Sequence, residues 1–193
     1  PYGRQHITGE DIKAVVAVLK SDFLTTGPKI AEFEKAFADF IGVPHAVALS
    51  SGTAALHAAA LTAEVKPGTI VTSPLTFAAS ANCGVYVGLT PGFVDIDPAT
   101  WNLDVRRPIP KDARVVVPVH YAGTPIDARA LRTKAVVIED ACHALGAEVA
   151  GERIGRCGHS AMTVFSFHPV KHITTGEGGM VTTRSAELAE RLL

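Results

Sequence analysis

The stretch with the most distinctive chemistry lies near the end of the sequence, where residues 166–171 read SFHPVK. It continues an apolar run typical of a buried strand and leads into a loop rich in threonine and glycine. Lys171 in such a place can form an imine with an aldehyde, because partial burial makes an amine easier to deprotonate. Ser166 can offer its hydroxyl to a phosphate. A lone lysine is usually a solvated surface residue, so this interpretation depends on the other motifs.

Two carboxylates follow another apolar run in VIEDACH, residues 137–143. A carboxylate at the end of a buried strand, such as Asp140, can pair with a protonated ring nitrogen and keep the ring an electron acceptor. His143 could face the same ligand. The alternative is that Asp140 caps the next turn and His143 is an ordinary polar residue, and this motif alone favours that alternative.

Two further motifs are candidates for contacts with a flat, phosphorylated ligand. Residues 51–56 read SGTAAL, and the backbone N–H groups of Gly52, Thr53 and Ala54 would open a helix whose dipole favours an anion by on the order of 1 kcal/mol. An ordinary helix cap explains this motif equally well. Phe77, in TFAAS, could stack on a heteroaromatic ring, although a core phenylalanine is the more common explanation.

Short apolar runs predict the elements that must position these residues. The runs are residues 46–49, 70–71, 93–94, 115–117, 135–138, 162–165 and 180–181. Their continuous hydrophobicity indicates burial on both faces, which is typical of a mainly parallel sheet between helices. We therefore expect an α/β sandwich of about seven strands over residues 45–193, with its ligand beyond the carboxyl ends of the strands.

Apolar residues at helical spacing predict two helices before the sheet. One has Ile12, Val15, Val16 and Leu19 on one face and begins at Thr8 or Gly9; the other runs to a stop at Gly42. Together they form an expected N-terminal helical arm over residues 1–44. A last helix begins at residue 185 and is still short at residue 193, so we expect the chain to be a fragment of a longer enzyme or to lack a second domain.

Composition narrows the class of protein. With 193 residues, 47% of them hydrophobic, and a formal net charge of -1, the chain should fold as one domain that binds neither nucleic acid nor a membrane. No signal peptide is visible, so the cytoplasm is expected. The three cysteines form no CxxC pair, which favours reduced, mostly buried thiols, and no metal is predicted. There is no GxGxxG or GxxxxGK[ST] nucleotide motif.

Together, the four motifs resemble the nucleotide-sugar aminotransferases of the DegT/StrS type, in the same order and at similar spacing across essentially the whole chain. The resemblance implies a large domain of the aspartate aminotransferase fold, with pyridoxal phosphate (PLP) as cofactor and a homodimer with sites at the subunit interface. It implies that Lys171 binds the PLP aldehyde, Asp140 the pyridine nitrogen and Phe77 the ring. It places His143 near the phenolic oxygen and assigns the phosphate to Gly52, Thr53, Ala54 and Ser166.

The implied reaction moves an amino group from L-glutamate, through the cofactor, to a UDP- or dTDP-linked 4-keto-6-deoxy sugar. Within the family the chain looks most like members that act on the way to pseudaminic acid, on the basis of PYGRQ at residues 1–5, SDFLT at residues 21–25 and FHPVK at residues 167–171.

Three features depart from the family pattern. The sequence given includes none of the family's small C-terminal domain. The connections at residues 101–115 and 125–135 are short, so we expect their crossover helices to be reduced or absent and more of the sheet to be exposed. Some relatives have histidine in place of the lysine and dehydrate sugars; Lys171 favours transamination, although His172 adjoins it. The alternative is a non-catalytic PLP-binding or dimerisation module.

Overall fold

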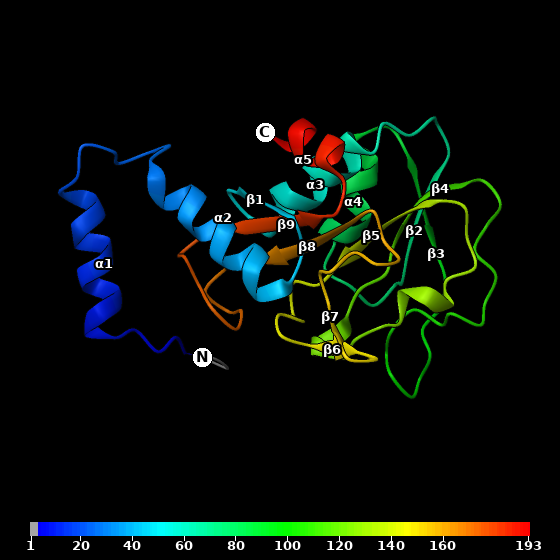
Figure 1. Ribbon diagram of the computed structural model, residues 1–193. Helices are drawn as coiled ribbons and strands as arrows, with labels where there is room; N and C mark the ends of the chain where they lie inside the picture. Colours follow the sequence, from blue (N-terminus) through cyan, green and yellow to red (C-terminus); the bar gives the residue numbers. More distant parts are fainter. Residues whose placement is uncertain (1–3) are drawn as a thin grey trace.

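The computed structural model describes residues 4–193 and has a seven-stranded sheet at its centre (Figure 1). The strand order is β1-β9-β8-β5-β4-β2-β3. The bounds are β1 His45–Leu49, β2 Thr69–Thr72, β3 Thr90–Phe93, β4 Ala113–Val117, β5 Val136–Asp140, β8 Met162–Ser166 and β9 Gly179–Thr183. Each apolar run of the sequence overlaps one of these strands, so the predicted α/β sheet is confirmed.

The sheet is mainly parallel, and only β9 runs against its neighbours. β9 pairs antiparallel with β1 and with β8, whereas β2, β3, β4, β5 and β8 are joined by parallel pairs. Two reversals across β9 leave β1 pointing the same way as β8. The carboxyl ends of β1, β2, β5 and β8 therefore lie at one edge of the sheet, where ligands bind in folds of this kind.

Helices cover both faces of the sheet. Their bounds are α1 Gly9–Leu19, α2 Pro28–Ile41, α3 Gly52–Thr62, α4 Ala79–Tyr86 and α5 Ala186–Leu192. One core cluster joins α3 and α4 to Met162 and Val164 of β8, with apolar residues of α5 packed against it, and a second joins α2 to Phe165. Neighbouring residues of a strand point to opposite faces, so β8 contributes to both cores.

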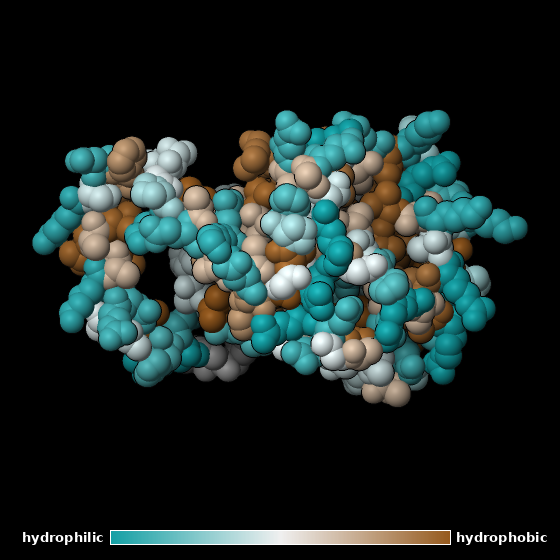
Figure 2. Space-filling model, viewed as in Figure 1, coloured by the Kyte–Doolittle hydropathy of each residue, from teal (hydrophilic) through white to brown (hydrophobic). Residues whose placement is uncertain are grey.

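The two predicted N-terminal helices form but differ in their packing. α2 ends at Gly42, which is left-handed at φ 80°, and buries Phe37 and Ile41 against the sheet. α1 begins after Thr8, whose side chain and backbone exchange hydrogen bonds with Asp11 in a capping box. No side chain of α1 is buried, and its apolar stripe is exposed. Figures 1 and 2 show α1 standing apart from the sandwich.

The connections over residues 101–115 and 125–135 contain no α-helix, as their lengths predict. The second connection holds one short 3-10 turn, η2 Ala128–Ala130, and another, η1 Tyr121–Gly123, lies between the two connections. The small hairpin of β6 Glu148–Val149 and β7 Glu152–Arg153 lies further along the chain. The sheet nevertheless stays covered there: Val71 and Val116 are fully buried under loop residues such as Leu103 and Ile126. The expectation that shorter connections expose the sheet is wrong, because irregular loops supply the apolar cover.

No helix among residues 4–193 has the length and apolar character needed to cross a membrane. Residues 1–3 of the PYGRQ segment, which contributes to the resemblance to pseudaminic acid enzymes, lie outside the described residues.

Candidate active site

Four strands deliver the predicted site residues to one edge of the sheet. β1 leads to Gly52, β2 leads to Phe77, β5 ends at Asp140 and β8 ends at Ser166. Lys171 follows in the turn after β8, where its backbone N–H donates to the carbonyl of His168. Tertiary structure therefore brings together side chains that are more than a hundred residues apart in the sequence.

Lys171 is half-buried and its amine contacts a neighbouring histidine. Lys171 Nζ lies 2.6 Å from His143 Nε2. Burial lowers the pKa of His143, and the charge of Lys171 lowers it further, while the charge of Asp140 acts in the opposite direction. A neutral His143 has a free lone pair and can accept a hydrogen bond from the ammonium group. Lys171 is thus not the solvated surface lysine of the alternative interpretation.

Asp140 is 5% exposed and is held by two donors. Ser80 Oγ donates to Asp140 Oδ2 at 2.7 Å, and the backbone N–H of Cys142 donates to Oδ1 at 3.2 Å. The second bond is the turn cap that the alternative interpretation anticipated. Among residues 4–193, no cationic side chain lies within salt-bridge distance of Asp140. A buried carboxylate with spare acceptor capacity and no cation fits a protonated ring nitrogen.

The start of α3 has the features expected of a phosphate seat, with one difference. Ser51 caps the helix by accepting from the N–H of Ala54 at 3.1 Å, so that N–H is already engaged. Within the described part of the chain, the N–H groups of Gly52 and Thr53 have no acceptor. A Cβ on Gly52 would lie 2.8 Å from the Cβ of Ser166, so glycine is required for this close approach. Two free N–H groups and a nearby hydroxyl fit a phosphate.

The side chain of Phe77 is 75% exposed, so Phe77 is not the core phenylalanine that is the more common explanation for such a residue. It lies in the segment between β2 and α4, and its carbonyl accepts from the backbone N–H of Ser80. Its exposed ring is therefore available to cover one face of a flat ligand.

The neighbouring carboxylate, Glu139, points to the other side of β5 and serves the core. Its Oε2 lies 3.0 Å from Nε2 of the fully buried His120, and its Oε1 accepts from Ser160 at 2.5 Å and from Thr163 at 3.2 Å. The N–H of Ile126 donates to His120 Nδ1, so Nε2 carries the proton. Burial raises the pKa of Glu139, but these hydrogen bonds outweigh it and the net shift is downward.

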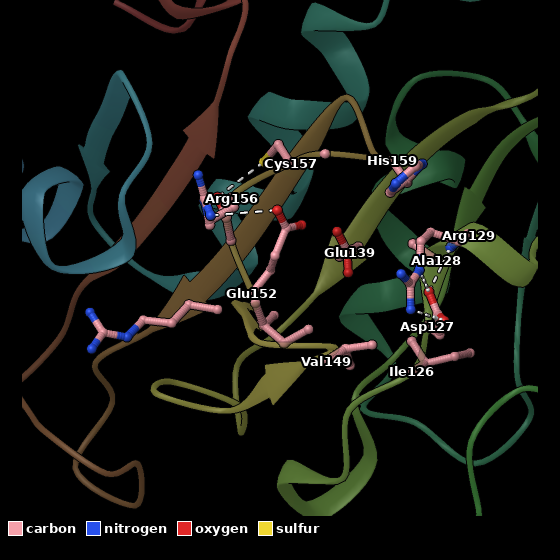
Figure 3. A pocket seen from close by; sticks show the side chains of 14 residues that line it. Ile126, Asp127, Ala128, Arg129, Glu139, Val149, Glu152, Arg156, Cys157 and His159 are labelled. Atoms are coloured by element: carbon pink, nitrogen blue, oxygen red, sulfur yellow. Dashed lines mark hydrogen bonds and ion pairs between the residues drawn. The ribbon is translucent and has the colours of Figure 1, made fainter.

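A small cavity of about 50 Å³ lies beside Glu139 (Figure 3). It is flanked by two ion pairs, Asp127 with Arg129 at 2.7 Å and Glu152 with Arg156 at 3.5 Å. These charges are already paired with one another. It is separate from the edge at which Lys171 and Asp140 lie.

All three cysteines are free thiols, as predicted. Burial raises the pKa of Cys83 to about 12 and of Cys157 to about 11, and it raises the pKa of Cys142 as well. They are therefore poor nucleophiles. Among residues 4–193 no cluster of His, Cys, Asp and Glu could hold a metal ion.

Three residues near the site had no role assigned from the sequence, although Thr76 and Ser80 lie within the TFAAS motif. Ser80 holds Asp140, and Thr76 Oγ1 lies 2.7 Å from Ser80 Oγ. Thr76 precedes α4, so helical spacing does not bring these two hydroxyls together. Gly179 pairs with Leu49 and with Ser166, and a Cβ there would lie 2.3 Å from the carbonyl of Ser51. No local pattern identifies that contact.

Comparisons with known proteins point to one family. The sequence model of the DegT/DnrJ/EryC1/StrS aminotransferase family matches residues 5–193. The chain is 41% identical to the UDP-4-amino-4-deoxy-L-arabinose–oxoglutarate aminotransferase of Shewanella sediminis, over 100% of this chain and 51% of that protein. The chain thus spans about half the length of the curated relatives it matches.

Solved structures show the same fold. An aminotransferase of pseudaminic acid biosynthesis from Helicobacter pylori has a TM-score of 0.91 and 35% identity, covering 100% of this chain and 54% of that one. A putative sugar aminotransferase from Streptococcus pneumoniae, in its PLP form, has a TM-score of 0.90 and 31% identity, covering 100% of this chain and 56% of that one.

Proposed function

The chain belongs to the DegT/DnrJ/EryC1/StrS aminotransferase family, and from this premise we propose that it is the PLP-binding large domain of a nucleotide-sugar aminotransferase. The proposed reaction moves an amino group from L-glutamate to a nucleotide-linked 4-keto-6-deoxy sugar. The observation that carries the proposal is the placing of Lys171, with its amine against His143, at the same sheet edge as Asp140 and the start of α3.

The residues present would hold PLP at four points. Gly52 and Thr53 offer free backbone N–H groups to the phosphate, and Ser166 offers a hydroxyl. Asp140 offers a carboxylate to the ring nitrogen, and the exposed Phe77 offers a ring face. When bound, PLP supplies an aldehyde for an amine to attack and a ring that withdraws electrons from the reacting carbon.

Lys171 and His143 would manage the proton at this site. An ammonium group must lose a proton before it can attack, and His143 Nε2 lies 2.6 Å from Lys171 Nζ. Because burial and the charge of Lys171 lower the pKa of His143, its imidazole is neutral near pH 7 and can hold the ammonium group by accepting its hydrogen bond. Once the lysine proton has passed to solvent, the free amine can act as the base that moves a proton on the substrate.

The names of relatives support the choice of substrates. One relative is named for a UDP-amino sugar and oxoglutarate, the keto acid that L-glutamate leaves behind, and one solved structure is named for pseudaminic acid biosynthesis. We propose the pseudaminic acid precursor, a UDP-linked 4-keto-6-deoxy sugar, as the first substrate to try. The homodimer and the cytoplasmic location stay predictions.

The experiment is a titration of the purified protein with PLP, followed by L-glutamate. We expect a visible absorption band from lysine-bound PLP, which Lys171→Ala abolishes and the surface control Lys66→Ala keeps. Glutamate should then bleach the band and release 2-oxoglutarate. A band that forms but yields no 2-oxoglutarate would favour the non-catalytic module instead. No band with the unaltered protein would contradict both functions.

A further inference from the structure

Two hydroxyl groups form a hydrogen-bonded chain that ends on the carboxylate of Asp140. Ser80, the second residue of α4, is fully buried, and its Oγ lies 2.7 Å from Asp140 Oδ2. Thr76, half-buried before α4, has its Oγ1 2.7 Å from Ser80 Oγ. No motif that the proposed function uses requires either hydroxyl, so their role is open.

The direction of both hydrogen bonds follows from proton counting. An ionised carboxylate only accepts, so Ser80 must donate its single hydroxyl proton to Asp140. Ser80 then has no proton left for Thr76, and Thr76 must donate to Ser80. Both hydroxyl dipoles therefore point their positive ends at Asp140. Such chains strengthen each bond by roughly 10–30%.

We propose that Ser80 is a positioning residue for Asp140, and that the Thr76–Ser80 chain keeps the proton of the cofactor's ring nitrogen on the ring. This inference rests on the proposed function. A proton between the carboxylate and the ring nitrogen goes to the more basic partner. Donation from Ser80 stabilises the carboxylate as an anion, so the proton stays on nitrogen and the ring remains a cation.

The burial of Asp140 makes this donor important. Among residues 4–193, Asp140 has no cationic side-chain partner within salt-bridge distance, and its other donor is the more distant N–H of Cys142, at 3.2 Å. Removing Ser80 Oγ takes away the shorter of these two bonds. A hydrogen bond to a charged group contributes about 1.5–3 kcal/mol, which corresponds to a change of roughly 10- to 150-fold in an equilibrium.

The chain offers a matched control on the adjacent carboxylate. Ser160 donates to Glu139 at 2.5 Å, so Ser160→Ala removes the same kind of bond from the next residue of β5. Glu139 points away from the site and is also bonded to His120 and Thr163. Ser160→Ala should therefore disturb the strand without changing the charge at the ring.

The test measures the ring-nitrogen ¹⁵N chemical shift in the protein loaded with ¹⁵N-labelled PLP. We expect a protonated-nitrogen shift in the unaltered protein, a displacement toward the unprotonated value in Ser80→Ala, and a smaller displacement in Thr76→Val. Ser160→Ala should match the unaltered protein. The glutamate half-reaction should slow by about 10- to 100-fold in Ser80→Ala and about two- to threefold in Thr76→Val.

Each outcome is decisive. Identical ¹⁵N shifts in the unaltered protein, Ser80→Ala and Thr76→Val would overturn the inference and leave the proposed function standing, as would equal displacements in Ser80→Ala and Ser160→Ala. If Ser80→Ala does not fold, the milder Thr76→Val variant decides the question alone. A protein that binds no PLP would overturn both the inference and the proposed function.

Discussion

At the scale of single residues, a histidine ring and a lysine amine lie within hydrogen-bond distance at the carboxyl edge of the sheet. His143 Nε2 lies 2.6 Å from Lys171 Nζ, and burial together with the lysine charge lowers the pKa of His143. The His143 imidazole therefore binds a proton less tightly in the folded protein than in the unfolded chain. Stability from this residue is present above the ordinary histidine pKa and is lost as the pH falls through the lowered value.

We predict that the pKa of His143, followed by NMR of its ring protons, lies below that of a free histidine. Lys171→Met should move it part of the way back up, because the lysine charge is removed while burial remains. Lys66→Met, on the surface, is the control and should leave it unchanged. An unchanged titration of His143 in Lys171→Met would show that the two groups are not coupled.

At the scale of elements, the start of β9 is pressed against the start of α3. Gly179 pairs with Leu49 of β1 and Ser166 of β8, and a Cβ there would lie 2.3 Å from the Ser51 carbonyl and 2.8 Å from the Gly52 nitrogen. Both contacts are backbone atoms, which cannot move without displacing the helix. The position of the phosphate seat thus depends on a residue from a different strand.

We predict that Gly179→Ala lowers the free energy of unfolding by about 1–3 kcal/mol, as overpacking does, and weakens PLP binding because α3 is displaced. Urea unfolding and a PLP titration measure the two effects. Gly158→Ala is the matched control, since its Cβ would meet only a flexible Glu152 carboxylate at 3.6 Å. If both variants behave alike, the close approach at Gly179 carries no cost.

At the scale of the whole molecule, the helices of the N-terminal arm do not share one role. α2 buries Phe37 and Ile41 in a core with Phe165, whereas α1 buries no side chain. Figure 1 shows α1 apart from the sandwich. Most helical stability comes from packing an apolar face. Packing of α2 therefore contributes to the stability of the sandwich, whereas α1 contributes little.

We predict that Val15→Pro, within α1, leaves the main melting transition unchanged, although proline in a helix interior costs about 3 kcal/mol locally. Lys35→Pro, at an exposed position within α2, should lower the melting temperature strongly, because α2 is part of the core. Differential scanning calorimetry of both variants provides the comparison. A large loss of melting temperature in Val15→Pro would mean that α1 is packed in solution.

Much of this protein is determined locally by its sequence. The apolar runs predicted where the strands lie, because a strand buried on both faces, such as β4 or β9, must be largely apolar along its length. The exposed edge strand β3 is the exception, since its run overlaps it only at Phe93. Thr8 and Gly42 set the start of α1 and the end of α2, since helix ends depend on adjacent side chains and on left-handed backbone. The motifs around Asp140 and Lys171 also indicated which residues reach the sheet edge.

Only the tertiary structure decided the rest, because the remaining contacts join residues far apart in the chain. It turned Glu139 toward His120 and Asp140 toward Ser80, a choice that two adjacent carboxylates do not reveal. It placed Gly179 against the start of α3. It also covered the sheet with irregular loops, at connections too short to hold the usual helices. Propensity and spacing act over a few residues, whereas packing against another strand has no local signature.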